Sequence, residues 1–388
     1  MTEFDAIRPY EKGEMHTALR QLLGDRHFNI MMRGFAPWLP RIVRNTLIRL
    51  AFIGIRTPQD FQIRFMKPIV RYILRKHADG ATFDHTTISN SGNYTFISNH
   101  RDIVLDSAIL GLQLHQSHFP ATCEIAIGDN LLIYPWIKTL VRMNKAFIVR
   151  RSLKAKEMLE SSQLMSRYIH YAITSKKENL WIAQREGRAK DSSDNTQDSV
   201  LKMLAMGGAG TPVQSLRELN IVPLTISYQY DPCDYLKAQE YQQKRDNPTW
   251  KKSKQDDLDN MRTGIFGQKG HVHYRTGRPL NEWIDQLSHL PRTEIFKEVA
   301  RRLDHEIHAG YRLYPGNYVA YDELNATTKY SNHYTPQDKA TFDAYVTSQL
   351  SKVTLEHPDH PFLRRQILTM YANPVVNLYN VQENRPHE

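Results

Sequence analysis

The sequence predicts an α/β domain with helical extensions at both ends. Three observations support this fold class. Between residues 83 and 230, short runs rich in β-branched and aromatic residues alternate with helical stretches. The residues before about 80 and after about 320 are mostly helical in pattern. The chain has 388 residues, enough to bury a large core. We therefore divide it into a basic helical region (1–80), an α/β domain (81–320) and a helical C-terminal extension (321–388).

The first region contains the longest apolar stretch of the chain, Leu39–Thr57. It is interrupted by four arginines: Arg41, Arg44, Arg49 and Arg56. No run reaches the roughly 18 apolar residues that a spanning helix needs. We expect a helix lying at a membrane surface, with its arginines reaching lipid phosphates. The alternative is a buried helix whose arginines pair within the protein. Helical character continues over Phe61–Lys76, where Pro68 is expected to introduce a kink.

The middle of the chain alternates strands and helices. The expected strands are Tyr94–Ser98, Glu124–Ile127, Ala146–Arg150, Leu180–Ala183 and Ile221–Tyr228. The expected helices are Asp102–Gln113, Leu131–Arg142, Leu153–Thr174 and Asp198–Met206.

After this alternating region, residues 237–262 are highly charged and polar. We interpret them as an exposed helix pair or an excursion from the core. A further strand is expected at His271–Tyr274 and a helix at Thr293–Tyr311. The segment Ala340–Leu378 is expected to be mostly helical.

The most informative stretch for chemistry runs from Ser98 to Asp106. A β-like run ends there, His100 follows in the turn, and an apolar helix begins. Asp102 is a candidate N-cap of that helix. Asp106 lies one turn further and could fold back under the imidazole, fixing its tautomer and stabilising the imidazolium. The other ring nitrogen would then take a proton from a hydroxyl, as a general base does. A structural His–Asp pair is the alternative.

Two further strand ends carry positive charge. The strand after Lys145 ends in Arg150 and Arg151, which suit bidentate phosphate binding at the carboxyl edge of a sheet. A solvated basic turn is the alternative. The strand at Leu180–Ala183 runs into a turn containing Arg185, Glu186, Gly187 and Arg188. Its glycine permits close backbone approach to a ligand. The apolar strand Ile221–Tyr228 is either a wall of the site or core sheet.

Composition narrows the class of partner. Lys and Arg number 51 against 41 Asp and Glu, a formal net charge of +10. This charge fits a phospholipid surface, nucleic acid or small phosphorylated molecules. No nucleic-acid-binding motif is present, so we expect no nucleic-acid partner. The two cysteines, Cys123 and Cys233, form no CxxC pair, which favours a reducing compartment. The first fourteen residues show no secretory signal, and no metal-binding spacing of His and Cys is seen.

The four elements together resemble the glycerol-3-phosphate and lysophosphatidate O-acyltransferase superfamily. They read NHRDIVLD, AFIVRR, REGRAKD and IVPLTISY, in the family's order and spacing, and the resemblance covers about residues 90 to 320. The stretches AIGDNL and YPGNY resemble the glycerol-3-phosphate branch. The Asn99–His100 pair that opens the first motif resembles the lysophosphatidate branch instead. Two departures stand out. Five residues separate His100 from Asp106 where the family has four, and Arg185 replaces the proline usual before Glu186.

The resemblance implies a mixed sheet flanked by helices and an acyl transfer without a covalent acyl-enzyme. His100 would be the general base, backed by Asp106 or, alternatively, Asp102. Arg150, Arg151, Arg188 and Lys145 would hold the acceptor phosphate, with Glu186 and Gly187 shaping that pocket. Arg185 would be a further substrate-binding residue. The donor would be acyl-CoA or acyl-carrier protein, and no metal or other cofactor is implied. The acceptor would be lysophosphatidate or glycerol 3-phosphate.

The same resemblance implies a peripheral or monotopic protein on the cytoplasmic face of a membrane, where it would contact phospholipid. Two alternatives remain open. The acceptor could be another lyso-lipid or an amino-acid-containing lipid. A protein of a different class, a non-catalytic basic lipid- or nucleic-acid-binding protein, would also account for the charge.

Overall fold

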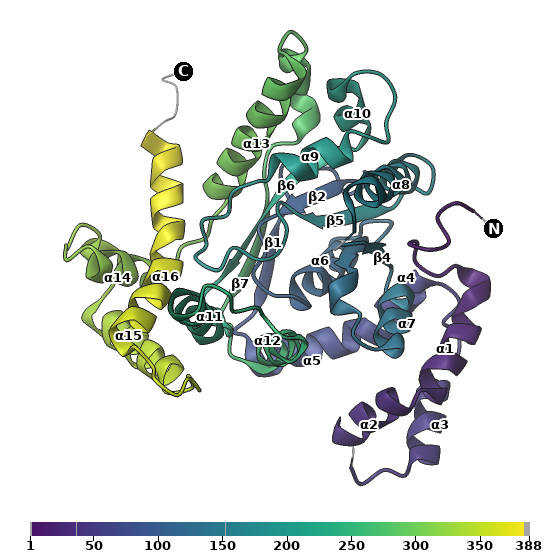
Figure 1. Ribbon diagram of the computed structural model, residues 1–388, viewed down its shortest axis with the longest axis horizontal. Coiled ribbons are helices and arrows are strands. Elements are labelled where there is room, and N and C mark those ends of the chain that lie inside the picture. Colours follow the sequence, from purple (N-terminus) through teal and green to yellow (C-terminus); the bar gives the residue numbers. More distant parts are fainter. Residues whose placement is uncertain (1, 36, 152, 384–388) are drawn as a thin grey trace.

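A seven-stranded mixed sheet forms the centre of the protein, as seen in a computed structural model that describes residues 2–35, 37–151 and 153–383 (Figure 1). The strands are β1 (Ala81–Asp84), β2 (Thr95–Ser98), β3 (Cys123–Gly128), β4 (Ala146–Val149), β5 (Asn179–Ala183), β6 (Ile221–Tyr228) and β7 (Val272–Thr276).

The strand order is β1-β7-β6-β2-β5-β3-β4. Strands β2 to β6 are parallel to one another, whereas β7 is antiparallel to β6 and parallel to β1. The carboxyl ends of β2, β3, β4 and β5 therefore lie at one edge of the sheet, the edge at which α/β proteins bind ligands. β6 has all eight residues buried, so this predicted strand is core sheet.

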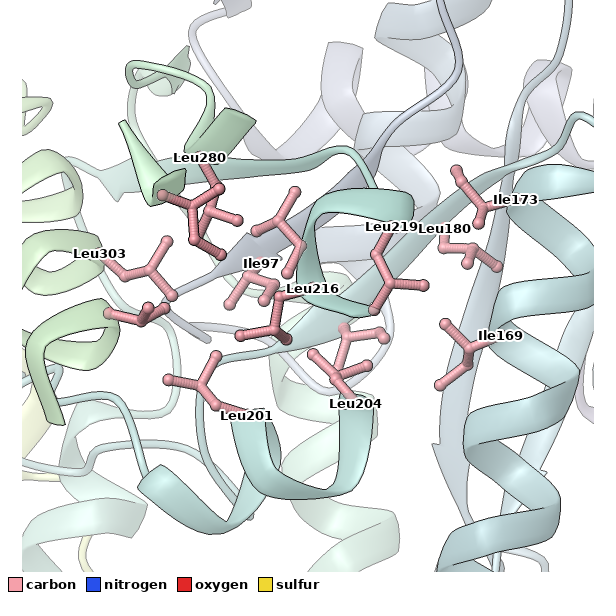
Figure 2. Close-up of a cluster of buried hydrophobic side chains, with 14 of the residues drawn as sticks. Ile97, Ile169, Ile173, Leu180, Leu201, Leu204, Leu216, Leu219, Leu280 and Leu303 are labelled. Carbon is pink, nitrogen blue, oxygen red and sulfur yellow. The ribbon is translucent and has the colours of Figure 1, made fainter. Parts of the chain in front are cut away.

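Helices cover both faces of the sheet. Apolar side chains of α8 (Ala155–Thr174), α9 (Asp198–Leu204), α10 (Pro212–Glu218) and α13 (Arg292–Ala309) pack on one face. Figure 2 shows part of this cluster, in which Ile169, Leu204 and Leu216 surround the strand residues Ile97 and Leu180. Side chains of α5 (Lys67–His77) and α6 (Leu105–Gln116) pack on the other face.

The N-terminal region forms a separate cluster beside α7 (Pro135–Met143). Helices α1 (Met15–Gly24), α2 (Arg26–Phe35) and α3 (Arg41–Ala51) extend away from the sheet at the lower right of Figure 1. The chain then passes through α4 (Pro58–Asp60) and a π-helix, η2 (Phe61–Met66), into α5. Pro68 lies in the first turn of α5, where a missing N–H is tolerated.

The C-terminal helices pack on α11 (Asp234–Asp246). They are α14 (Pro315–Leu324), α15 (Pro336–Leu350) and α16 (His360–Glu383). Helix α12 (Lys254–Phe266) follows α11 and lies near α5. Short 3-10 helices are η1 (Lys12–Glu14), η3 (Asp129–Leu131), η4 (Leu280–Glu282), η5 (Ile284–Leu287) and η6 (Ser331–His333).

The sequence-based fold class is confirmed, with boundary corrections. Every predicted strand occurs within one or two residues of its expected place, but β1, α10 and most of α14 were missed. The helix predicted at Leu131–Arg142 is α7, which begins at Pro135. Helix α6 begins at Leu105 rather than Asp102, because residues 101–104 form an irregular turn. Residues 237–262 are a helix pair, but not a simple exposed one, since α11 buries Lys237, Ala238, Glu240 and Gln242.

Candidate active site

The turn after β2 brings an imidazole and a carboxylate together. His100 follows Ser98, the last residue of the strand, and Asp106 lies in the first turn of α6. Nδ1 of His100 is 2.8 Å from Oδ2 of Asp106. The same carboxylate oxygen accepts hydrogen bonds from the backbone amides of Arg101 and Asp102, at 2.7 and 3.0 Å. These amides fix the fully buried carboxylate under the ring.

Asp102 has a different position. Its Oδ1 accepts hydrogen bonds from the amides of Val104 and Leu105, at 2.8 and 2.7 Å. The N-cap residue of α6 is Val104, however, and not Asp102 as the sequence predicted. Asp102 lies two residues before the N-cap and satisfies two amides at the start of the helix, and no contact with the imidazole occurs among the described residues. Burial, followed by the charge of nearby Asp106, raises the pKa of the Asp102 carboxyl.

The remaining surface of the His100 ring faces a cleft. Trp181 of β5 meets the imidazole edge to face, with ring centroids 5.3 Å apart. The indole is itself held by a 3.0 Å hydrogen bond from its Nε1 to Ser98 Oγ. Only 13% of the His100 side chain is exposed. Since Asp106 occupies Nδ1, Nε2 is the nitrogen left to exchange a proton with a substrate.

The cleft beside His100 has an empty volume of about 1100 Å³ and is open to solvent. Five cationic side chains line it against two acidic ones, so it favours an anionic ligand. The cationic residues are Arg151, Arg185, Arg188, Lys190 and Lys252, and the acidic ones are Glu186 and Asp257. Its apolar wall includes Ile103, Ile125, Ile127, Leu131 and Trp181.

The turn after β5 supplies the charged end of this cleft. Glu186 pairs with Arg151 at 3.4 Å and so orients that guanidinium. Nε of Arg185 and Nη1 of Arg188 are buried without a hydrogen-bond partner among the described residues. Both side chains line the cleft and add to its positive charge. Gly187 has a φ of +70°, a backbone conformation that glycine adopts without strain and that allows this tight turn.

A buried network fastens the loop that follows this turn to the His100 turn. Arg101, next to His100, donates to Ser192 Oγ and to Asp194 Oδ2, both at 2.6 Å. Tyr311 donates to the same oxygen of Asp194. Asn99 exchanges two hydrogen bonds with the backbone of Ile226 in β6. The placement of the His100 turn against residues 192–194 and against β6 is therefore set by buried polar contacts, which are costly to break.

The structure does not bring all the predicted residues to this cleft. Lys145 precedes β4 and lies at the opposite edge of the sheet, where its buried ammonium pairs with Glu178 at 2.6 Å. Arg150 lines a neighbouring apolar cavity on the α8 face instead, with Met158, Met165 and Met203. Arg151, Arg185 and Glu186 line both cavities.

Sequence reasoning missed several lining residues. Lys190 directly follows the REGRA segment, and its position four residues after Glu186 was the available signal. Lys252 and Asp257 come from the charged α11–α12 segment, which carried no local signal for a site. Burial lowers the pKa of Lys190 to about 8, although its partner Glu240 opposes that effect. Among the described residues, no group of three or more His, Cys, Asp or Glu side chains could hold a metal ion.

Comparison with known proteins adds two findings. The acyltransferase family model matches residues 82–227, which contain the His100 turn and the Arg185–Arg188 turn. The chain is similar to the crystal structure of the 1-acyl-sn-glycerophosphate (LPA) acyltransferase PlsC from Thermotoga maritima. That similarity has a TM-score of 0.38 at 12% identity and covers 77% of this chain and 99% of the other. No curated protein has a sequence that matches this chain. Residues 82–227 therefore match the acyltransferase family, which confirms the family resemblance of the sequence motifs within this segment.

Proposed function

We propose that this protein transfers a fatty acyl group from a thioester donor to a hydroxyl of a glycerol-phosphate-type acceptor in phospholipid synthesis. The observation that carries the proposal is the His100–Asp106 pair at 2.8 Å, placed in a cationic cleft and within the segment that matches the acyltransferase family. The donor is acyl-CoA or acyl-carrier protein. The acceptor is glycerol 3-phosphate or lysophosphatidate, and another lyso-lipid or an amino-acid-containing lipid is the further candidate.

In the proposed mechanism, Nε2 of His100 takes the proton of the acceptor hydroxyl while Asp106 stabilises the resulting imidazolium. The acceptor oxygen attacks the thioester carbonyl carbon, and backbone amides near the turn stabilise the oxyanion. The tetrahedral intermediate then breaks its C–S bond. The leaving thiolate takes the proton back from His100, so the enzyme returns to its starting state without a covalent intermediate.

The acceptor phosphate binds at the charged end of the cleft. Arg185 and Arg188 line this end, and each has a buried donor nitrogen without a hydrogen-bond partner among the described residues. Arg151 is paired with Glu186. Guanidinium groups bind phosphate oxygens in bidentate geometry, which fixes the acceptor's orientation as well as its affinity. Gly187 lets the backbone of this turn approach the ligand closely.

We also propose that α2 and α3 place the protein on the cytoplasmic face of a membrane. Large apolar side chains are exposed on this hairpin: Ile30, Trp38, Ile42, Val43, Leu47, Leu50 and Ile53. Arg41, Arg49 and Arg56 are exposed beside them and suit lipid phosphates. Arg44 is buried instead and donates to the carbonyl of Asn29 at 3.3 Å. None of the described helices is long and apolar enough to cross a bilayer.

Acyl transfer by the purified protein in liposomes tests the reaction. Labelled acyl-CoA and acyl-carrier protein are each offered with glycerol 3-phosphate, lysophosphatidate and a panel of other lyso-lipids. We expect one donor–acceptor pair to give product and His100→Ala to abolish it while the circular dichroism spectrum stays unchanged. Product formed at an undiminished rate by His100→Ala would contradict the mechanism, and no product with any pair would contradict the function.

Vesicle flotation tests the membrane contact separately. Wild-type protein should float with anionic liposomes, and Ile42→Asp combined with Ile53→Asp should weaken flotation without affecting folding, because both side chains are more than two-thirds exposed. Equal flotation of the two proteins would contradict the assignment of this surface.

A further inference from the structure

The α11–α12 segment forms part of the wall of the His100 cleft. It lies beyond residue 227, where the match to the acyltransferase model ends. Two of its residues, Lys252 and Asp257, line the same cleft as His100, Arg185 and Arg188. The cleft is thus completed by a segment outside the four motifs.

Helix α12 is held against both turns of the site. Gly264 packs on Asp102 so closely that a Cβ at this position would overlap Oδ2 of the aspartate. Four residues earlier, Oδ1 of Asn260 accepts a 2.9 Å hydrogen bond from Nη2 of Arg188. Asn260 is buried, and its carbonyl accepts from the Cys233 thiol at 3.3 Å. These contacts fix α12, and the residues just before it, relative to the catalytic turn.

Lys252 faces the cleft with donor capacity to spare. Its ammonium donates to Oδ1 of Asp257 at 2.5 Å. The side chains are 24% and 19% exposed, so the pair is partly withdrawn from water. An ammonium has three N–H donors, and Asp257 takes one of them.

We propose that Lys252 is a further acceptor-binding residue, whose ammonium contacts the phosphate of the acceptor. Asp257 holds this ammonium in place and competes with the phosphate for its hydrogen bonds. The identity of the ligand rests on the proposed function. In this arrangement Lys252 adds a cation from the α11–α12 segment to the phosphate-binding set of Arg185 and Arg188, which line the same cleft. The α11–α12 segment is then a determinant of acceptor affinity.

The chain offers matched controls for the test. Lys251 and Lys254 flank Lys252, carry the same charge, are exposed and do not line the cleft. Lys252→Met, Lys251→Met and Lys254→Met change the net charge equally. We expect Lys252→Met to raise the KM for the acceptor roughly tenfold, as loss of one hydrogen bond between charged groups predicts. Its kcat and donor KM should stay within about twofold of wild type, and both controls should match wild type. Asp257→Asn should lower the acceptor KM, because it frees the ammonium.

A binding measurement separates this inference from the proposed reaction. Titration calorimetry with glycerol 3-phosphate, and with inorganic phosphate, needs no donor and no turnover. Weaker binding by Lys252→Met than by both controls supports the inference even if no acyl transfer is found, in which case the proposed function alone fails. Equal dissociation constants and equal acceptor KM values in all three variants would overturn it. If neither glycerol 3-phosphate nor inorganic phosphate binds the wild type, the proposed role of Lys252 is overturned too.

Discussion

Nδ1 of His100 lies 2.8 Å from Oδ2 of Asp106 although five residues separate them in the sequence, one more than in the related motif. The irregular turn at residues 101–104 takes up the extra residue before α6 begins. The amides of Arg101 and Asp102, which belong to that turn, donate to the same carboxylate oxygen. The longer spacing therefore preserves the contact instead of transferring the role to Asp102.

This geometry predicts opposite consequences for the two aspartates. Asp106→Asn should lower kcat roughly 10²- to 10⁴-fold with little change in acceptor KM, because the amide cannot stabilise the imidazolium. Asp102→Asn should keep activity within about tenfold and lower the free energy of unfolding by up to about 1 kcal/mol, the usual range for a helix cap. Steady-state kinetics and urea unfolding of both variants provide the check. A larger loss of kcat in Asp102→Asn would reverse the assignment.

The motifs predicted the sheet edge and the two turns because each is a local pattern of a strand followed by polar residues. The error with Lys145 is instructive. It lies next to β4, as Arg151 does, but it comes before the strand, and the two ends of a strand lie at opposite edges of a sheet. Arg150 and Arg151 are adjacent in sequence, yet only Arg151 lines the His100 cleft. Lys252, Asp257 and Asn260 reach the site through tertiary packing of α12, which local pattern does not encode.

The division between the two cavities leads to a prediction about the arginines. Arg185→Ala should raise the acceptor KM more than Arg150→Ala does, because Arg185 lines the cleft of His100 and Arg150 lines only the neighbouring cavity. A loss of about tenfold or more is expected for Arg185, the scale of one charged hydrogen bond. Acceptor and donor KM values are measured separately for each variant. An equal or larger effect of Arg150→Ala on the acceptor KM would place the phosphate in the other cavity.

Lys190 predicts how acceptor binding depends on pH. Burial lowers its pKa to about 8, so its ammonium loses the proton as pH rises through that value. The phosphate of the acceptor is already fully ionised there, since its second pKa is about 6. The acceptor KM should therefore increase above pH 8 while the donor KM stays constant. In Lys190→Arg the side chain remains charged, and the increase should disappear. A rise of the same size in both proteins would show that another group titrates.

Gly264 should tolerate no side chain. A Gly→Ala change inside a helix usually stabilises a protein by about 1 kcal/mol. Here the added methyl would overlap the Asp102 carboxylate, so we expect the free energy of unfolding to fall by about 1–3 kcal/mol and kcat to fall with it. Gly111 in α6 is the control, because a Cβ there meets nothing within 4 Å and Gly111→Ala should be neutral or stabilising. Thermal unfolding and activity of the two variants are compared. Equal stability would mean that α12 does not rest on the catalytic turn.

Asp234 predicts how the attachment of the C-terminal helices depends on pH. It is fully buried at the start of α11, where Tyr345 and Tyr371 donate to its Oδ2 at 2.7 and 3.0 Å. Burial, followed by the charge of Asp231, raises its pKa from 3.8 to about 7. Between these two values the unfolded chain releases the proton and the folded protein keeps it. Rising pH therefore costs stability across this window, by on the order of a few kcal/mol in total, and the cost is constant above pH 7.

Asp234→Asn removes this titration and keeps the size of the side chain. The free energy of unfolding, measured in urea from pH 4 to pH 8, should therefore fall less steeply with pH in the variant than in the wild type. The new amide does not titrate. If it makes weaker hydrogen bonds than the carboxyl group, the variant's free energy of unfolding is lower by the same amount at every pH, and the slope with pH is unaffected. Other buried acids, such as Asp304, whose pKa is raised to about 6 by burial, contribute equally to both proteins. Parallel curves would mean that Asp234 ionises in the folded protein as readily as in the unfolded chain, and that its buried tyrosine partners compensate its charge in full.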